Sequence, residues 1–143
     1  MYESQRIGKA FKAGVFALAL AGCATMMGGD RVGVTLSGGE QVPPVTTSAS
    51  GSGVIVIGED KSVSGSVTTS GLAGVAAHIH QAARGQNGPV AVGMVQSSPG
   101  IWSIPAGAKL NDAQYAAYKA GNLYVNVHTA ANKGGEIRGQ LIP

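Results

Sequence analysis

Three histidines are the side chains of this chain best suited to chemistry, and they lie in two short segments. His78 and His80 lie in the run 77–80, and His128 ends the run 124–128. Side chains of an extended strand alternate between its faces, so His78 and His80 would share a face at roughly 6.5–7 Å from each other. A third imidazole from a neighbouring strand would complete a three-histidine set. Such a set suits zinc, or copper in a redox role, with an open position for water or another ligand.

Four further polar residues are candidates for supporting roles around these histidines. Asn126 shares a predicted strand face with His128, and Glu136 and Arg138 lie two positions apart in the last predicted strand. We interpret Glu136 and Arg138 as an ion pair or neighbouring pair, with the alternative that Glu136 fixes the tautomer of a histidine. Glu40 is either a loop carboxylate or a partner of the same site. The alternative to a metal site is that each imidazole only hydrogen bonds on a polar sheet face, to Asn126 or Glu136.

The segments around these residues predict short strands joined by glycine-rich turns. Alternating or short apolar runs occur at 31–36, 50–58, 62–70, 75–80, 89–95, 100–105, 122–129 and 135–141. The run 54–57 is short and continuous enough for a strand buried on both sides. Alternation places Val75, Ala77 and Ile79 on a core face, opposite the histidines. Eight or so short strands with turn signals between them predict an all-β, antiparallel sandwich.

One short helix is expected in the C-terminal part of the chain. Asn111 has the character of an N-cap, and Gln114 stands three residues later, as in a capping box. Gly121 would end the helix. We interpret this helix as a lid over one end of the sandwich.

The first 22 residues have the pattern of an export signal. Three basic residues, Arg6, Lys9 and Lys12, precede the uncharged and mostly apolar stretch 13–22. That stretch is far shorter than the roughly 20 apolar residues of a spanning helix, so a cleaved signal peptide is the better interpretation.

The end of this segment, Leu-Ala-Gly followed by Cys23, resembles a bacterial lipobox. The resemblance implies that the thiol of Cys23 accepts a lipid, that residues 23–30 form a tether, and that residues 31–143 form the exported domain. By resemblance to lipoprotein sorting rules, Ala24 after the cysteine implies the outer membrane, with the domain facing the periplasm or the exterior. The alternative is an ordinary signal site with an accidental cysteine. Cys23 is the only cysteine, so no intramolecular disulfide is expected.

The charge balance argues against nucleic acid as a partner. Three of the ten Lys and Arg residues and one of the seven Asp and Glu residues precede Cys23. Seven basic and six acidic residues remain, a net charge of +1, and they form no basic run. No phosphate-binding glycine motif and no nucleophile with a flanking base is present, which disfavours hydrolysis.

Four segments taken together resemble the CHRD domain, a family named from repeats in chordin that also occurs alone in bacterial exported proteins. The segments are 40–44, 78–90, 120–129 and 135–141. They span about residues 32–142 in the family's order. The resemblance implies an Ig-like or superoxide-dismutase-like β-sandwich and no general activity. The His-x-His pair and the later histidine are also similar, in part, to copper-zinc superoxide dismutases, but this chain lacks their further histidines, the aspartate of the zinc subsite and the disulfide.

Three functions are compatible with these features. The first is a non-enzymatic, lipid-anchored binding module of the cell envelope, whose His78, His80 and His128 recognise a metal ion or an envelope protein. The second is a small copper-dependent redox enzyme that uses the same histidines. The third is a purely structural envelope protein.

Overall fold

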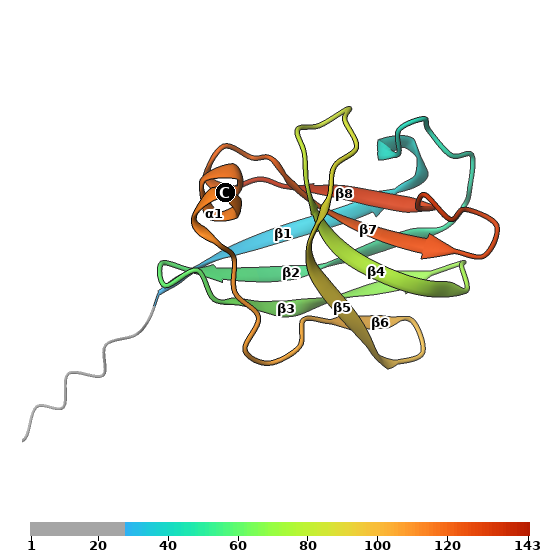
Figure 1. Ribbon diagram of the computed structural model, residues 1–143. Coiled ribbons are helices and arrows are strands. Elements are labelled where there is room, and N and C mark those ends of the chain that lie inside the picture. The colour runs from blue at the N-terminus through green and yellow to red at the C-terminus, as the bar shows by residue number, and fades with distance from the viewer. Residues whose placement is uncertain (1–27) are drawn as a thin grey trace, which may run out of the picture.

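A computed structural model describes residues 28–143, so the expected signal peptide and Cys23 lie outside the described residues. The chain folds mainly into strands (Figure 1). The strands are β1 (Gly29–Ser37), β2 (Ser50–Gly58), β3 (Val63–Ser70), β4 (Gly74–Gln81), β5 (Val90–Ser98), β6 (Ile101–Ser103), β7 (Leu123–Thr129) and β8 (Ile137–Leu141). The helices are α1 (Asp112–Lys119) and a single 3-10 turn, Gly38–Glu40. The prediction of an all-β chain with one short helix is therefore confirmed.

The eight strands form one antiparallel sheet that closes into a barrel, in the order β1-β2-β3-β6-β5-β4-β7-β8. The antiparallel strands are as expected, but they form a closed barrel instead of the expected sandwich. The ring closes because the end of β1 meets β8, where Ser37 pairs with Arg138. In Figure 1, β7, β4 and β5 pass in front of β1, β2 and β3. Because β4 and β7 pair with each other, residues on the outer side of these two strands are neighbours on one face of the barrel.

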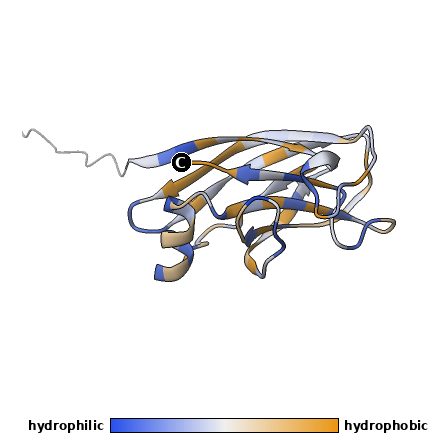
Figure 2. Cartoon of the chain, turned by 90° about the horizontal axis from the view of Figure 1, so that it is seen from above, coloured by the Kyte–Doolittle hydropathy of each residue, from blue (hydrophilic) through white to orange (hydrophobic). Residues whose placement is uncertain are grey.

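The core lies inside this barrel and follows the alternation of the strands. Leu36, Ile55, Ile79 and Val125 have no exposed surface. Orange apolar stretches alternate with paler and blue polar ones along the strands in Figure 2. All the buried apolar side chains come from residues 32–141 of the described chain. The described residues 28–143 thus share one apolar core.

Two details of the predicted faces are wrong. Ile55 and Ile57 are buried, but Val54 keeps 36% of its surface exposed, so β2 is covered on one side only. Val75 was expected in the core and is 63% exposed. The register between β4 and β7 shifts between Gly74 and Ala76, which makes Val75 the extra residue of a bulge and turns it outward.

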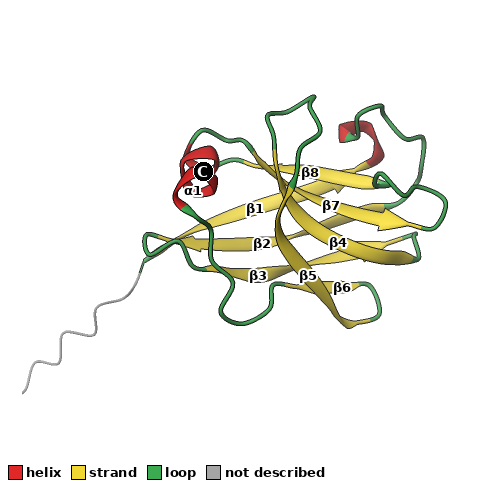
Figure 3. Cartoon of the chain, in the orientation of Figure 1, coloured by secondary structure: helices red, strands yellow, loops and turns green. Residues whose placement is uncertain are grey.

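The helix α1 begins as its sequence predicts. The side chain of Asn111 accepts a hydrogen bond from the backbone N–H of Gln114, and the Gln114 side chain accepts one from the Asn111 backbone N–H. Gly121 follows the helix with a φ of +74°, a left-handed conformation that glycine adopts without steric cost. Tyr118 is fully buried, and its hydroxyl donates to Asp30 in β1 at 3.1 Å. The helix therefore closes one end of the barrel (Figure 3).

Loops 38–49 and 82–89 cover the outer side of β7 and β8. Arg138 and Gln140 point away from the core, yet they are only 1% and 7% exposed. The side chain of Gln140 donates to the carbonyl of Ala82 at 2.9 Å, and Gln41 donates to Asn126 at 2.7 Å. This face therefore has a second, polar layer that is ordered by side-chain hydrogen bonds. Among the described residues, no helix is long and apolar enough to cross a membrane.

Candidate metal centre

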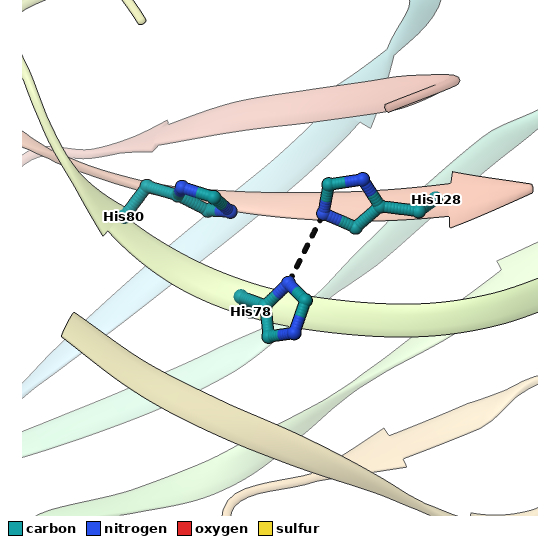
Figure 4. Close-up of side chains that lie close together, drawn as sticks. All are labelled: His78, His80 and His128. Atoms are coloured by element: carbon teal, nitrogen blue, oxygen red, sulfur yellow. Dashed lines mark hydrogen bonds between the residues drawn. The ribbon is translucent and has the colours of Figure 1, made fainter. Parts of the chain in front are cut away.

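Two adjacent antiparallel strands bring the three histidines together. His78 and His80 lie on the outer side of β4, where alternation places both opposite the buried Ile79. The register of β7 on β4 sets His128 opposite Ala76, so His128 is one diagonal step from His78 on the same face. Each histidine offers one ring nitrogen, and these three atoms lie within 4.8 Å of one another. Figure 4 shows the three rings converging above the strands.

Backbone carbonyls fix the tautomers of two of these rings. Nδ1 of His80 lies 2.9 Å from the carbonyl oxygen of Gly88, and Nδ1 of His128 lies 2.8 Å from that of Lys133. A carbonyl oxygen only accepts hydrogen bonds, so each of these Nδ1 atoms carries a proton. The Nε2 atom of each ring therefore presents a lone pair, which is the form that binds a metal ion.

The third ring completes the cluster through one of these lone pairs. Nδ1 of His78 lies 3.1 Å from Nε2 of His128. Because Nε2 of His128 carries the lone pair, Nδ1–H of His78 donates a hydrogen bond to it in the metal-free protein. Nε2 of His80 is buried and has no hydrogen-bond partner. An imidazole lone pair without a partner is costly in a protein interior, and a bound cation would satisfy it. His78 would present a lone pair after a tautomer shift or a ring rotation.

The rings pack closely around a common centre. The ring centroid of His78 lies 5.5 Å from that of His80 and 5.0 Å from that of His128. Nitrogens bound to one zinc ion at roughly 2.0–2.1 Å lie no more than about 4.2 Å apart. Small rotations of the rings would therefore bring the cluster to the dimensions of a three-histidine metal site.

The surroundings of His78 and His80 favour the neutral form of these two imidazoles. Burial lowers the pKa of His78, and the neighbouring His128 and His80 lower it further. Burial also lowers the pKa of His80, against the hydrogen bond to Gly88, which raises it. The charges of His128 and Arg138 add to the lowering of the His80 pKa. Neutral imidazole is the metal-binding form, so the site does not have to lose a proton from these two residues near neutral pH.

An aromatic and cationic stack lies beside His80. The ring of Tyr124 stacks on His80 with centroids 5.1 Å apart and an interplanar angle of 10°. Arg138 also stacks on Tyr124, and its guanidinium carbon lies 3.4 Å from the centroid of the Tyr124 ring. The phenol oxygen of Tyr124 accepts a hydrogen bond from the backbone N–H of Gly88 at 3.2 Å. Loop 82–89 thus orients both His80 and Tyr124.

None of the predicted supporting residues forms a hydrogen bond to an imidazole of the cluster. Asn126 binds Gln41 and the carbonyl of Gly134. Glu40 forms an ion pair with Arg84 at the rim of the molecule. Neither of these two residues supports a histidine through a hydrogen bond.

Of the two expectations for Glu136 and Arg138, an ion pair or a neighbouring pair, the ion pair does not form among the described residues. The carboxylate of Glu136 accepts hydrogen bonds from the hydroxyls of Thr47 and Thr129 and from the amide of Asn132. These hydrogen bonds, led by that from Thr129, lower the pKa of Glu136. Arg138 instead stacks on Tyr124, because loop 82–89 encloses the side of β8 that carries it. Glu136 therefore ties loops together and does not fix a histidine tautomer.

The groups that do fix the tautomers are backbone carbonyls, which sequence reasoning did not identify. Only a weak signal pointed to one of them, namely the glycine- and proline-rich turn after His80. A main-chain carbonyl has the same chemistry at every residue, so its role depends on where the loop folds. Two surface hollows of about 380 and 220 Å³ lie along loop 39–45, and neither is lined by a histidine.

Comparison with known proteins identifies a family. A model described as the CHRD domain matches residues 32–141. The chain therefore belongs to the CHRD domain family, as its sequence segments predict. No curated protein matches the chain. No solved structure matches it either.

Proposed function

We propose that this CHRD-domain protein is a non-enzymatic metal-binding module of the bacterial cell envelope, which holds one copper or zinc ion through His78, His80 and His128. The observation that carries the proposal is the buried Nε2 atom of His80, which has no hydrogen-bond partner and lies in a cluster of three ring nitrogens. Its opposite nitrogen is held by the carbonyl of Gly88. An imidazole fixed on one side and free on the other is the usual arrangement of a metal ligand.

The test is a metal titration of the domain that begins at residue 24, purified without a histidine tag. Copper and zinc are titrated into the wild type and into His78→Ala, His80→Ala and His128→Ala. We expect one equivalent of tightly held metal in the wild type and a loss of at least about tenfold in affinity in each variant. Gln96→Ala, an exposed position on β5, serves as the control that keeps full binding.

Each result of this titration has a defined meaning. If the wild type binds no metal at micromolar concentration while its fold is intact, the metal site does not exist. The histidines would then be part of a structural or protein-binding face. If metal is bound but all three variants keep it, the ion lies elsewhere.

A copper-dependent redox enzyme at the same site is the second candidate. The observation that favours it is the open space beside His78. Gly93 on β5 lies opposite His78, and a Cβ built on Gly93 would meet no atom within 4 Å. A small molecule could therefore approach a metal ion from this side and take an open coordination position. Activity of the copper-loaded protein toward superoxide or a reductant, lost in His78→Ala, distinguishes this candidate from a binding module.

The envelope location rests on the N-terminal segment. We propose that Cys23 carries a lipid that anchors the domain at the outer membrane, facing the periplasm or the exterior. The basic residues, the apolar stretch 13–22 and the small residues before Cys23 support this proposal. Incorporation of a labelled fatty acid in cells, and release of Cys23→Ala into the soluble fraction, test it. A wild type that incorporates no label contradicts it.

A further inference from the structure

Arg138 is a buried cation without a carboxylate partner. It is 1% exposed, and its two terminal nitrogens donate to the side-chain oxygen of Asn87 and to the carbonyl of Ala83, each at 3.3 Å. The ion pairs of the described residues are Lys61–Asp112, Arg84–Glu40 and Lys119–Asp30, so Arg138 takes part in none of them. Its positive charge is therefore not neutralised by direct contact. Burial lowers the pKa of Arg138; from a distance the carboxylate of Glu40 raises that pKa, whereas the cation Arg84 lowers it, and Glu40 itself is paired with Arg84.

This charge lies close to the three-histidine cluster. The guanidinium carbon is 3.4 Å from the Tyr124 ring centroid, and that centroid is 5.1 Å from the centroid of His80. The guanidinium carbon is therefore no farther from the His80 ring than the sum of these distances, about 8.5 Å. Tyr124 is only 2% exposed and fills the space between them, so water does not screen the charge there.

The cluster itself offers nothing to offset this charge. Three neutral imidazoles add no negative charge, and no carboxylate or thiol of the described residues belongs to the cluster. A bound ion therefore keeps its full charge next to Arg138. The repulsion is proportional to that charge, so a divalent ion is penalised twice as strongly as a monovalent one. At this range, and at the effective dielectric constant of protein sites, the extra unit charge weakens binding by on the order of tenfold.

We propose that Arg138 makes this site selective for the cuprous ion over divalent ions, zinc in particular. Imidazole nitrogens bind both copper and zinc, and among these the cuprous ion is the monovalent one. The inference depends on the proposed metal function of the three histidines and adds the residue that determines which ion is preferred. Arg138 touches neither the ion nor its ligands. It acts through the stacked ring of Tyr124 and through its charge.

The decisive variant places a carboxylate directly on Arg138. Asn87 is exposed and its side-chain oxygen already accepts from Arg138, so Asn87→Asp would pair the guanidinium without removing it. Asn87→Ser is the first control, because like Asn87→Asp it loses the donation to Val42, but it adds no charge. Gln86→Glu is the second, because it adds the same charge at an exposed neighbouring position.

The measurement compares two affinities for each variant. Cuprous affinity is measured without oxygen against a chromophoric cuprous chelator, and zinc affinity against a fluorescent zinc chelator. We expect wild type to keep its cuprous ion in the presence of equimolar zinc. We expect Asn87→Asp to strengthen zinc binding about tenfold more than cuprous binding, with both controls within about twofold of the wild-type ratio.

Failure of this inference differs from failure of the metal site. If zinc displaces the cuprous ion from the wild type, or if Asn87→Asp leaves the ratio of affinities unchanged while it remains folded, the role of Arg138 is overturned and the metal site stands. If the wild type binds neither ion, the metal site itself is overturned. Arg138→Gln adds a second measurement, and it should shift the ratio in the same direction as Asn87→Asp.

Discussion

Nδ1 of His80 lies 2.9 Å from the carbonyl oxygen of Gly88, eight residues later in the chain. This single hydrogen bond turns the other nitrogen of His80 toward His78 and His128, where it has no partner of its own. Loop 82–89 is therefore part of the site, although none of its side chains belongs to the cluster.

The first prediction concerns the position of this loop. A Cβ built on Gly88 would overlap the carbonyl oxygen of Gln81, so Gly88→Ala must displace the loop and with it the carbonyl that holds His80. We expect the variant to bind metal about 10- to 100-fold more weakly than wild type, the usual effect of losing a group that orients a metal ligand. The measurement is a competitive metal titration.

Gly93→Ala is the matched control for this variant. Gly93 lies on β5 opposite His78, and a Cβ there would meet nothing within 4 Å. We expect it to fold and to bind metal as the wild type does. Equal affinities of Gly88→Ala and Gly93→Ala would show that the Gly88 carbonyl does not orient His80.

The sequence predicted the strands, and the strand faces on which the histidines lie, better than it predicted the closure of the sheet. Whether the three histidines meet depends on the pairing of β4 with β7, which the sequence does not reveal. Alternation is a local property, so it correctly placed Ile79 inside and His78 and His80 outside. Barrel closure depends on the meeting of β1 and β8, whose paired residues Ser37 and Arg138 lie far apart in sequence. The apolar side chain of Val75 predicts burial, and no feature of the neighbouring sequence predicts the bulge that exposes it.

The partners of the polar residues could not be predicted from spacing alone. Glu136 and Arg138 lie two positions apart, which favours an ion pair on an open strand face. Two loops cover that face and supply the Thr47 hydroxyl to Glu136 and the Asn87 amide to Arg138. The neighbouring strand β7 supplies the Thr129 hydroxyl to Glu136 and the Tyr124 ring to Arg138. These contacts depend on how each loop folds over the sheet. The turn residues in the sequence show that the chain bends there, but they do not show in which direction the loop runs.

The second prediction concerns the start of α1. Asn111→Ala removes the side chain that accepts from the Gln114 backbone, so we expect a loss of about 1 kcal/mol in the free energy of unfolding. Lys109→Ala, at an exposed position just before the helix, should change stability by less than about 0.5 kcal/mol. Chemical denaturation of both variants measures the difference. Equal stabilities would mean that the capping box does not stabilise the fold.

The third prediction concerns the carboxylate that ties three segments together. Glu136→Gln keeps the shape of the side chain but weakens the hydrogen bonds from Thr47, Thr129 and Asn132, so we expect a loss of about 1–2 kcal/mol in the free energy of unfolding. Glu59→Gln, an exposed turn residue, is the control and should be neutral.

The pH dependence of this effect has a defined sign. The hydrogen bonds from Thr129 and Thr47 hold the pKa of Glu136 below its ordinary value of 4.5. The stabilisation is therefore present above pH 4.5 and is lost as the pH falls through the lowered pKa of the folded protein. The gap between wild type and Glu136→Gln should close in acid. A gap that persists at low pH would show that the carboxylate charge is not its source.

The last prediction concerns the metal-free protein at mildly acidic pH. Burial lowers the pKa values of His78 and His80 below the ordinary 6.5, so the unfolded chain binds protons more readily than the folded one in this range. The free energy of unfolding then rises with pH below 6.5 and levels off above it. Denaturation curves of the apo protein between pH 5 and 7.5 should therefore show a loss of stability as the pH falls, and this loss should shrink in His80→Gln, which cannot titrate. The same loss in His80→Gln as in wild type would mean that His80 accepts a proton without cost, which its buried and unpartnered nitrogen argues against.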